Sequence, residues 1–368
     1  MKKSGSRKTL KKDKIKFYDV FRIGLELEGE FINEPNEEGY QEFFRVASDG
    51  SLDHQGYEER GHLMELEGSI IEEETQQKRF INFFKKLEVP VGEDGRYKQF
   101  ALNNNTAGTH LHFSFKRGYI EKILNGVDTQ EKFGVSSMTM YKYYHLIFDG
   151  VDFERYFFRR YFNCFKLSKF WDRLGNNYCK PFSDRETNRK ADIRDFNLYN
   201  IERKKGGRRD KYQWLNTLSL ANGEGVEIRI FPYLVTAGGI EDVIEFSKDV
   251  LKGFLVQKAT KRKIRLIERF FEIKKNYKFN ENFLRKYDRA LLTSFTANSG
   301  VDFNRPSITK LSIDLIEFYC YLFDNNKKAF EPRNPEQEID ENAHEDSERE
   351  ASEDRATPAF SAEYLSND

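Results

Sequence analysis

Residues 103–115 combine an Asn-rich loop with a regular alternation of polar and apolar side chains. If residues 108–115 form a β-strand, His110, His112 and Ser114 point to one face, and the aliphatic and aromatic residues between them point to the other. Such a strand belongs in a sheet that packs against a core on one side only. A solvent-exposed antiparallel strand and a functional site explain the polar row equally well, and this stretch alone does not separate them.

A second stretch, residues 21–31, alternates in the same way and is acidic on one face. In a regular strand, Glu26, Glu28 and Glu30 lie on the same side, opposite aliphatic residues. Three carboxylates in a row repel one another, a pattern that a solvent-facing strand rarely needs and a cation site does. The segment therefore predicts a strand whose polar face holds positive charge.

Two shorter segments repeat this arrangement. Glu65 and Glu67 share one face of a predicted strand, and Glu227 and Arg229 share one face of another. Ordinary solvent-facing strands are the alternative for each pair taken singly. Together with the two stretches above, they predict several strands with polar side chains on one side.

Turn and helix signals place these strands in a mixed fold. An Asn-Gly pair joins predicted strands at 212–220 and 225–233 into a hairpin, and an Asp-Gly pair predicts a tight turn within 46–52. Apolar residues recur with helical spacing at 72–87, 136–170, 238–257, 261–275, 281–293 and 308–323. The expected fold class is α+β, with a mainly antiparallel sheet flanked by helices and a helical C-terminal part.

Composition excludes several classes of protein. The chain has 368 residues with 34 Phe and 19 Tyr, enough aromatic material for a large core despite 33% charged residues. No apolar run approaches the roughly 20 residues that span a bilayer. The three cysteines are widely spaced, which supports neither a disulfide framework nor a structural zinc site. A reducing cytoplasm is the simplest compartment, and no membrane partner is expected.

The zero net charge conceals an asymmetry. Residues 331–368 carry 13 acidic and 3 basic residues, so residues 1–330 carry a net charge of +10. Residues 1–18 are Lys-rich and are expected to form a basic flexible arm, either solvated or touching phosphate. The acidic segment is expected to be disordered because it has few apolar anchors.

The polar faces favour hard divalent cations and an anionic ligand. Carboxylates with a single imidazole suit Mg²⁺ or Mn²⁺ better than zinc. Arg229 beside Glu227 fits poorly in a site that only binds metal, and fits well if the metals hold an anion that the guanidinium also contacts. Neither a Walker-type phosphate loop nor GxGxxG occurs. These residues indicate nucleotide phosphates and phosphoryl transfer.

In this order along the chain, the motifs resemble the amidoligase family, which belongs to the glutamine-synthetase-like carboxylate–amine ligases. The resemblance covers about residues 20–260 and rests on five segments: Gly24-Leu-Glu-Leu-Glu28, Asp49-Gly-Ser51, Glu65 to Ser69, Ala107-Gly-Thr-His-Leu-His112 and Val226-Glu-Ile-Arg-Ile-Phe231. It implies a curved antiparallel sheet of the glutamine-synthetase type, with ATP and Mg²⁺ (or Mn²⁺) as cofactors.

The resemblance implies a set of divalent-metal ligands. They are Glu26, Glu28, Glu65, Glu67, His110 and Glu227. The second acidic segment departs from the family, which usually continues with Ser-Pro where this chain has Gly68-Ser69. That departure leaves open whether Glu65 or Glu67 is the ligand at this position.

The resemblance also implies residues that contact the nucleotide and the acceptor. Arg229 would hold the transferred phosphoryl group, and an acidic residue such as Asp49 or Glu67 would attract and deprotonate the amine. Residues implied to lie near the nucleotide are Asn105, His112, Ser114, Lys180, Asn216 and Arg229.

The implied reaction is ATP-dependent formation of an amide through an acyl phosphate, with a small-molecule or peptide carboxylate and an amine as substrates. Two alternatives remain. One is a guanidino-kinase-like phosphoryl transferase on the same fold; the other is a non-catalytic nucleic-acid-binding protein, which is less favoured. The identities of the carboxylate and amine, and the oligomeric state, stay open.

The expected organisation has four parts. They are a basic arm at 1–18, a catalytic domain at 19–260, a helical extension packed on it at 261–330, and an acidic tail at 331–368.

Overall fold

The computed structural model describes residues 15–31, 43–47, 62–87, 108–161, 164, 214–222, 225–232, 234, 236–280, 282, 301–308 and 311–333. Several predicted features lie outside these ranges. They are Asp49, Asn105, Lys180, the helix at 281–293 apart from residue 282, the arm before residue 15 and the tail after residue 333.

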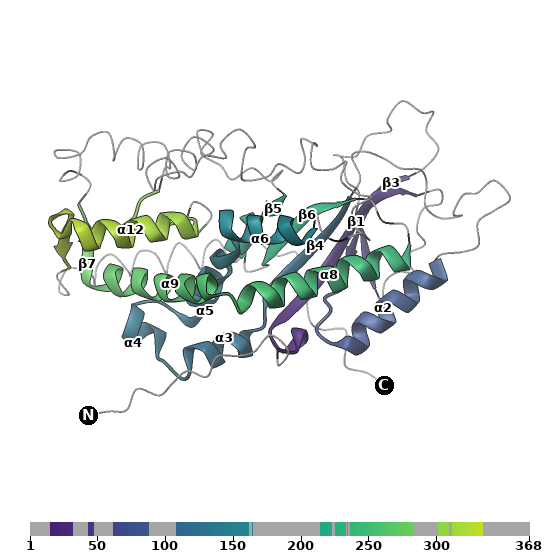
Figure 1. Cartoon of the computed structure of the whole chain (residues 1–368), viewed down its shortest axis with the longest axis horizontal. Helices are drawn as coiled ribbons and strands as arrows, with labels where there is room; N and C mark the ends of the chain where they lie inside the picture. Colours follow the sequence, from purple (N-terminus) through teal and green to yellow (C-terminus); the bar gives the residue numbers. More distant parts are fainter. Residues whose placement is uncertain are drawn as a thin grey trace.

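A six-stranded antiparallel sheet forms the centre of the molecule (Figure 1), and its strand order is β2-β3-β1-β4-β6-β5. The strands are β1 (Phe21–Phe31), β2 (Phe44–Ala47), β3 (His62–Gly68), β4 (Gly108–Phe115), β5 (Leu215–Asn216) and β6 (Val226–Pro232). Mixed helices and antiparallel strands confirm the α+β class. The longest strand, β1, lies between β3 and β4, so segments far apart in sequence meet on either side of it.

The alternation predicted from the sequence divides the sheet into two faces. On β1, Ile23, Leu25 and Leu27 are 1–2% exposed, and Leu111 and Phe113 on β4 are 0–1% exposed. These side chains belong to one hydrophobic core that also contains the apolar residues of the covering helices. Burial of this face fixes the register of the strands, because a slip of one residue would turn every apolar side chain outward.

Two helices that contact each other, α2 (Glu74–Leu87) and α8 (Ala237–Leu255), lie along the sheet (Figure 1). Thr236 caps the α8 helix, and its hydroxyl accepts a hydrogen bond from Gly239 N–H at 3.0 Å. Both helices match the predicted segments within two residues.

At the other end of the molecule, α9 (Lys258–Asn276) lies beside α12 (Ile313–Asn325), as Figure 1 shows. A two-stranded sheet of β7 (Tyr277–Phe279) and β8 (Phe330–Pro332) closes this end. These two helices were predicted, whereas the short sheet was not. Ring contacts of Tyr319 with Phe270 on α9 and Phe279 on β7 join these elements into one core.

The predicted helix at 136–170 is divided into shorter pieces. Two α-helices, α5 (Ser137–Tyr144) and α6 (Val151–Tyr161), are separated by a 3-10 helix, His145–Phe148. Ser136 caps α5, accepting a hydrogen bond from Thr139 N–H. Two small helices, α3 (Arg117–Leu124) and α4 (Thr129–Phe133), were not predicted.

One strand prediction needs correction. The strand expected at 212–220 is limited, among described residues, to β5, and a 3-10 helix, Leu218–Asn222, follows it. The Asn216 side chain accepts a hydrogen bond from Leu218 N–H at 2.9 Å, which turns the chain out of the sheet. Of the turn expected within 46–52, only residues 46 and 47 are described; they belong to β2, whose pairing with β3 was not predicted.

The packed region extends slightly beyond the expected boundaries. Ile15, Phe17 and Tyr18 are buried in the core, although they fall within the predicted arm. The α9 helix begins at Lys258 and crosses the expected boundary at 260. Within the described part of the chain, no helix has the length and apolar character needed to cross a membrane.

Candidate metal and nucleotide site

The strand register brings the predicted polar residues together on the sheet face opposite the core. Glu26 in β1 lies between Glu67 of β3 and His110 of β4. Two residues farther along β4, His112 lies opposite Glu227 of β6. Residues as far apart in sequence as Glu26 and Glu227 therefore share one surface, because four antiparallel strands keep their alternation in phase.

His110 lies at the centre of this surface and is 1% exposed. Its Nδ1 atom is 3.3 Å from Glu26 Oε2 and 3.0 Å from Glu227 Oε1, and its Nε2 atom is 3.3 Å from Glu28 Oε2. Burial alone would lower the pKa of His110, but the surrounding carboxylates, Glu28 foremost, raise it well above its usual value. Three carboxylates around one imidazole create a strongly negative potential that favours positive charge at this position.

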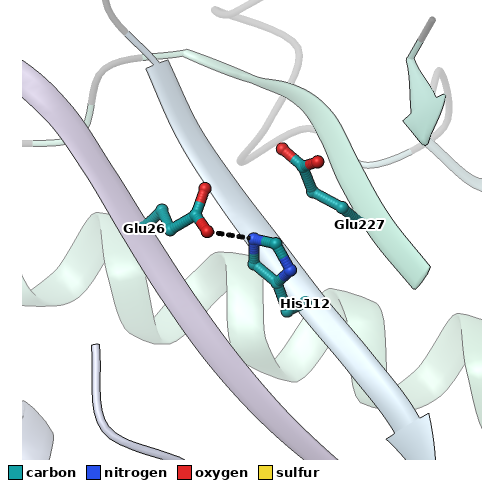
Figure 2. A group of neighbouring side chains, drawn as sticks. All are labelled: Glu26, His112 and Glu227. Atoms are coloured by element: carbon teal, nitrogen blue, oxygen red, sulfur yellow. Dashed lines mark ion pairs between the residues drawn. The ribbon is translucent and has the colours of Figure 1, made fainter. Parts of the chain in front are cut away.

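Among the described residues, His112, Glu26 and Glu227 form a group that could hold one metal ion (Figure 2). One ligand atom of each lies within 4.8 Å of the other two. His112 Nε2 and Glu26 Oε1 are 2.6 Å apart, and the two side chains come from neighbouring strands. Burial opposes ionisation of Glu26, but His112 and His110 hold the pKa of its carboxyl well below the usual range. The two imidazoles thus balance the negative charge of Glu26, which a bound cation would otherwise balance.

Glu28 and Glu65 are paired directly across β1 and β3. Burial, reinforced by the charges of Glu26 and Glu28, raises the pKa of Glu65 to about 8. Glu67 lies opposite Glu26, is 30% exposed in its side chain, and has Arg45 Nε 3.9 Å from its Oε2 atom. The register therefore places both glutamates on the polar face, with Glu65 beside Glu28.

The neighbouring Gly68 occupies a position that is too close to β1 for a side chain. A Cβ atom at this position would lie 2.5 Å from the carbonyl oxygen of Leu25, which excludes a side chain here. β3 ends at Gly68, and Ser69 N–H then donates to Phe43 O at 2.7 Å.

Arg229 lies at the edge of the acidic group. Its Nη1 atom is 3.0 Å from Glu227 Oε1 and its Nη2 atom is 3.6 Å from Glu28 Oε1. The pairing of β4 with β6 is irregular here, because Thr109 pairs with Phe231 and Leu111 with Ile228. The extra residue in β6 is a bulge opposite His110, the kind of irregularity that re-aims side chains beside functional sites.

Asn216 orients one carboxylate of the site. Its Nδ2 atom donates to Glu227 Oε2 at 2.8 Å, while its carbonyl oxygen is held by Leu218 N–H. Burial disfavours the charged form of Glu227, but the close contact with His110, with the charges of His112 and Arg229, lowers its pKa to about 2. Both ends of the Asn216 amide are engaged, so its position favours orienting Glu227 over direct contact with a nucleotide.

Three buried polar atoms of this face support the binding of a divalent cation. His110 Nε2, His112 Nε2 and Glu227 Oε1 are buried and make no hydrogen bond within the described part of the chain. Each nevertheless lies within 3.3 Å of a charged atom. These contacts are short enough for hydrogen bonds, but their angles are not suitable for one. Buried polar atoms without hydrogen bonds are costly in a folded protein, and a coordinated ion would satisfy them.

Of the predicted site residues, eight lie together on this face. They are Glu26, Glu28, Glu65, Glu67, His110, His112, Glu227 and Arg229, with Asn216 beside them. Ser114 lies farther along β4 on the same face and is 2% exposed. Asp49, Asn105 and Lys180 lie outside the described residues.

Two arginines on this face were not identified from the sequence. Arg22 precedes Glu26 by four residues on β1, and its Nε atom donates to Ser114 Oγ at 2.6 Å. Arg45 lies opposite Glu67. The alternation that identified Glu26 and Glu28 also includes position 22, so its polar face was readable from the sequence.

Comparison with known proteins gives no close relative. No protein-family model matches the chain, and no curated protein matches it. Among solved structures, the crystal structure of a bifunctional glutathione synthetase from Pasteurella multocida is similar, with 12% sequence identity and a TM-score of 0.32. The match covers 85% of this chain and 48% of that one, so this chain spans about half the length of that protein.

Proposed function

We propose that this protein is an ATP- and Mg²⁺-dependent carboxylate–amine ligase that forms an amide through an acyl phosphate. The observation that supports it most is the convergence of Glu26, Glu28, Glu227 and His110 on one sheet face, with Arg229 at 3.0 Å from Glu227. Acidic groups that share a buried surface with a guanidinium suit a metal-bound anion better than either a metal or an anion alone.

The metal ligands proposed are Glu26, Glu28, Glu65, His110 and Glu227. His112 is a further ligand on the geometry of Figure 2, since its Nε2 atom lies beside Glu26 and near Glu227. When bound, Mg²⁺ neutralises a triphosphate and polarises the transferred phosphoryl group. Mn²⁺ is expected to substitute because the set contains imidazole nitrogen as well as carboxylate oxygen.

Arg229 would stabilise negative charge on the moving phosphoryl group. In the structure, its guanidinium is held by Glu227 and Glu28, which fixes its direction before a ligand arrives. A preorganised donor of this kind supports catalysis because it needs little reorganisation during the reaction. Asn216 would act through Glu227 as a positioning residue.

The reaction proceeds in two steps. An oxygen of the substrate carboxylate attacks the γ-phosphorus of ATP, and the bond to the leaving ADP oxygen breaks. The amine nitrogen then attacks the acyl carbon, inorganic phosphate leaves with the carboxylate oxygen, and the nitrogen loses a proton. Glu67, which is partly exposed beside Arg45, or Asp49 is proposed to accept that proton.

A product assay tests this proposal. Purified protein is incubated with ATP, Mg²⁺ and mixtures of carboxylates and amines, and products are identified by mass spectrometry. We expect ADP and phosphate release that requires both a carboxylate and an amine, with ¹⁸O transferred from labelled carboxylate to phosphate. A stable phosphorylated product without an amide would instead indicate a phosphoryl transferase.

A matched pair of variants separates this chemistry from nucleic-acid binding. Glu28→Gln should abolish ADP formation, whereas Glu121→Gln, an exposed position on α3, should not. Salt-sensitive nucleic-acid binding that persists in Glu28→Gln, without nucleotide turnover in the wild-type protein, would contradict the proposal.

A further inference from the structure

Arg22 occupies the polar sheet face at some distance from the acidic group. It lies four positions before Glu26 along β1, or about 13 Å between Cα atoms at the usual rise of a strand. It is paired with Ser114 across β1 and β4, in line with the side chains of His112 and His110. The polar face therefore has an arginine at each end of the acidic group, Arg229 at one and Arg22 at the other.

The guanidinium of Arg22 is oriented by one contact. Its Nε atom donates to Ser114 Oγ at 2.6 Å, and Ser114 is itself 2% exposed. Within the described part of the chain, no carboxylate pairs with Arg22. Its two terminal nitrogens thus remain available, in the planar arrangement that binds phosphate or carboxylate oxygens in pairs.

Among the described residues, Gly24 leaves the strand surface between Arg22 and Glu26 without a side chain. Gly24 lies between them on the same face and opposite His112. A Cβ atom at position 24 would meet only Gly68 O at 3.8 Å and His112 Cβ at 3.9 Å, both ordinary contacts. A glycine that the backbone does not require here leaves a flat floor between the arginine and the proposed metal ligands.

We infer that Arg22 and Ser114 form a second anion subsite, which binds a phosphate group of the nucleotide away from the metal-bound end. This inference rests on the proposed function. An anion that contacts both the acidic group and Arg22 has to be elongated and to cross Gly24. A nucleotide polyphosphate meets that requirement, whereas the single carboxylate of an acceptor does not.

Isothermal titration of the full-length protein with Mg²⁺ and AMPPNP tests the subsite. Arg22→Gln is expected to weaken AMPPNP binding by roughly 10- to 100-fold, the range for loss of a charge-assisted contact. Arg22→Lys, which keeps the charge and loses the planar pair of donors, should fall between. Mn²⁺ binding without nucleotide should stay within about twofold of wild type in both variants.

Three further variants make the test independent of whether Arg22→Gln folds. Gly24→Ala adds a methyl group that the fold accommodates but that occupies the proposed path of the nucleotide, so AMPPNP should bind less tightly. Gly238→Ala on α8, where nothing lies within 4 Å of the added atom, is its control. Arg262→Gln, an exposed arginine paired with Glu317, is the control for charge.

The outcomes separate this inference from the proposed function. If wild-type protein binds no AMPPNP with Mg²⁺, the proposed function fails and the subsite fails with it. If wild type binds and Arg22→Gln and Gly24→Ala both match their controls, the subsite alone is wrong. A raised KM for the carboxylate substrate with unchanged AMPPNP affinity would assign Arg22 to the acceptor and overturn the phosphate assignment.

Discussion

Glu28 on β1 and Glu65 on β3 are directly opposite each other in an antiparallel pair. Like charges in this arrangement destabilise a sheet, and here the pKa of Glu65 is raised to about 8 by burial and by the charges of Glu26 and Glu28. Without a ligand, this pair lowers the stability of the folded protein, and a bound cation would remove that loss.

The first prediction concerns this pair. Glu65→Gln should stabilise the metal-free protein at pH 7 by up to about 1 kcal/mol, because the neutral amide stands opposite Glu28 without the proton uptake that Glu65 needs. The same change should weaken divalent-ion binding, since it removes a proposed ligand. Thermal unfolding in EDTA and in MgCl₂ measures both effects, with Glu121→Gln as control. A variant less stable than wild type in EDTA would contradict this account of the pair.

The second prediction is that divalent ions stabilise the protein. At 100 times the dissociation constant, Mg²⁺ or Mn²⁺ should raise the free energy of unfolding by about 2.7 kcal/mol, and EDTA should reverse the effect. Calorimetric melting of wild type and Glu26→Gln measures this. Equal shifts in the two proteins would show that the ion binds elsewhere.

The third prediction is a dependence on pH in the metal-free protein. Between about pH 4.5 and 8, folded Glu65 keeps a proton that the unfolded chain has lost, so its contribution to stability falls as pH rises through this window. His110, whose pKa is raised, acts in the same direction above its ordinary value. Saturating Mg²⁺ should abolish this decline, because cation binding requires the deprotonated ligands. Urea unfolding at pH 6 and pH 8.5, with and without Mg²⁺, checks the sign; stability of the Glu65→Gln protein should change less.

The sequence predicted the polar face better than it predicted the surrounding elements. Alternation over 21–31 and 108–115 assigns Glu26, Glu28 and His110 to one side, since a strand's period of two leaves no other solution once the apolar face is buried. The helix at 238–257 was also predictable, because its apolar residues follow one stripe and Thr236 provides a cap.

Other features depend on contacts between distant segments and were not predictable. The bulge opposite His110 arises from the pairing of β4 with β6. β5 is short because Asn216 bonds to the next turn and to Glu227, which local propensity does not encode. The importance of Arg22 depended on a partner, Ser114, that lies 92 residues away in sequence.

The fourth prediction concerns His145, which contacts the last residue of β4. Buried His145 accepts a hydrogen bond from Phe115 N–H at 2.9 Å, and its Nδ1–H donates to Tyr141 O at 2.9 Å, so it is neutral. Burial, opposed in part by the Tyr141 contact, lowers its pKa to about 4. The unfolded chain binds a proton between pH 6.5 and 4 that the folded one does not, so stability falls as pH falls through this range.

The expected loss of stability on acidification is about 3 kcal/mol. It follows from a pKa difference of about 2.5 between folded and unfolded His145, at about 1.36 kcal/mol per pKa unit. Replacing the imidazole in His145→Gln should lower stability at pH 7 and remove most of this decline. Chemical denaturation at pH 7 and pH 4.5 compares the two proteins. An equal loss on acidification in both would mean that other groups account for it.

The central claim is that the face built around His110 binds a nucleotide through divalent ions. Titration calorimetry with AMPPNP, with Mg²⁺ and then with EDTA, tests it most directly in wild type, Glu28→Gln and Glu121→Gln. The account predicts binding that requires Mg²⁺, is lost in Glu28→Gln and persists in Glu121→Gln. Absence of Mg²⁺-dependent binding in the wild-type protein, or undiminished binding in Glu28→Gln, would contradict it.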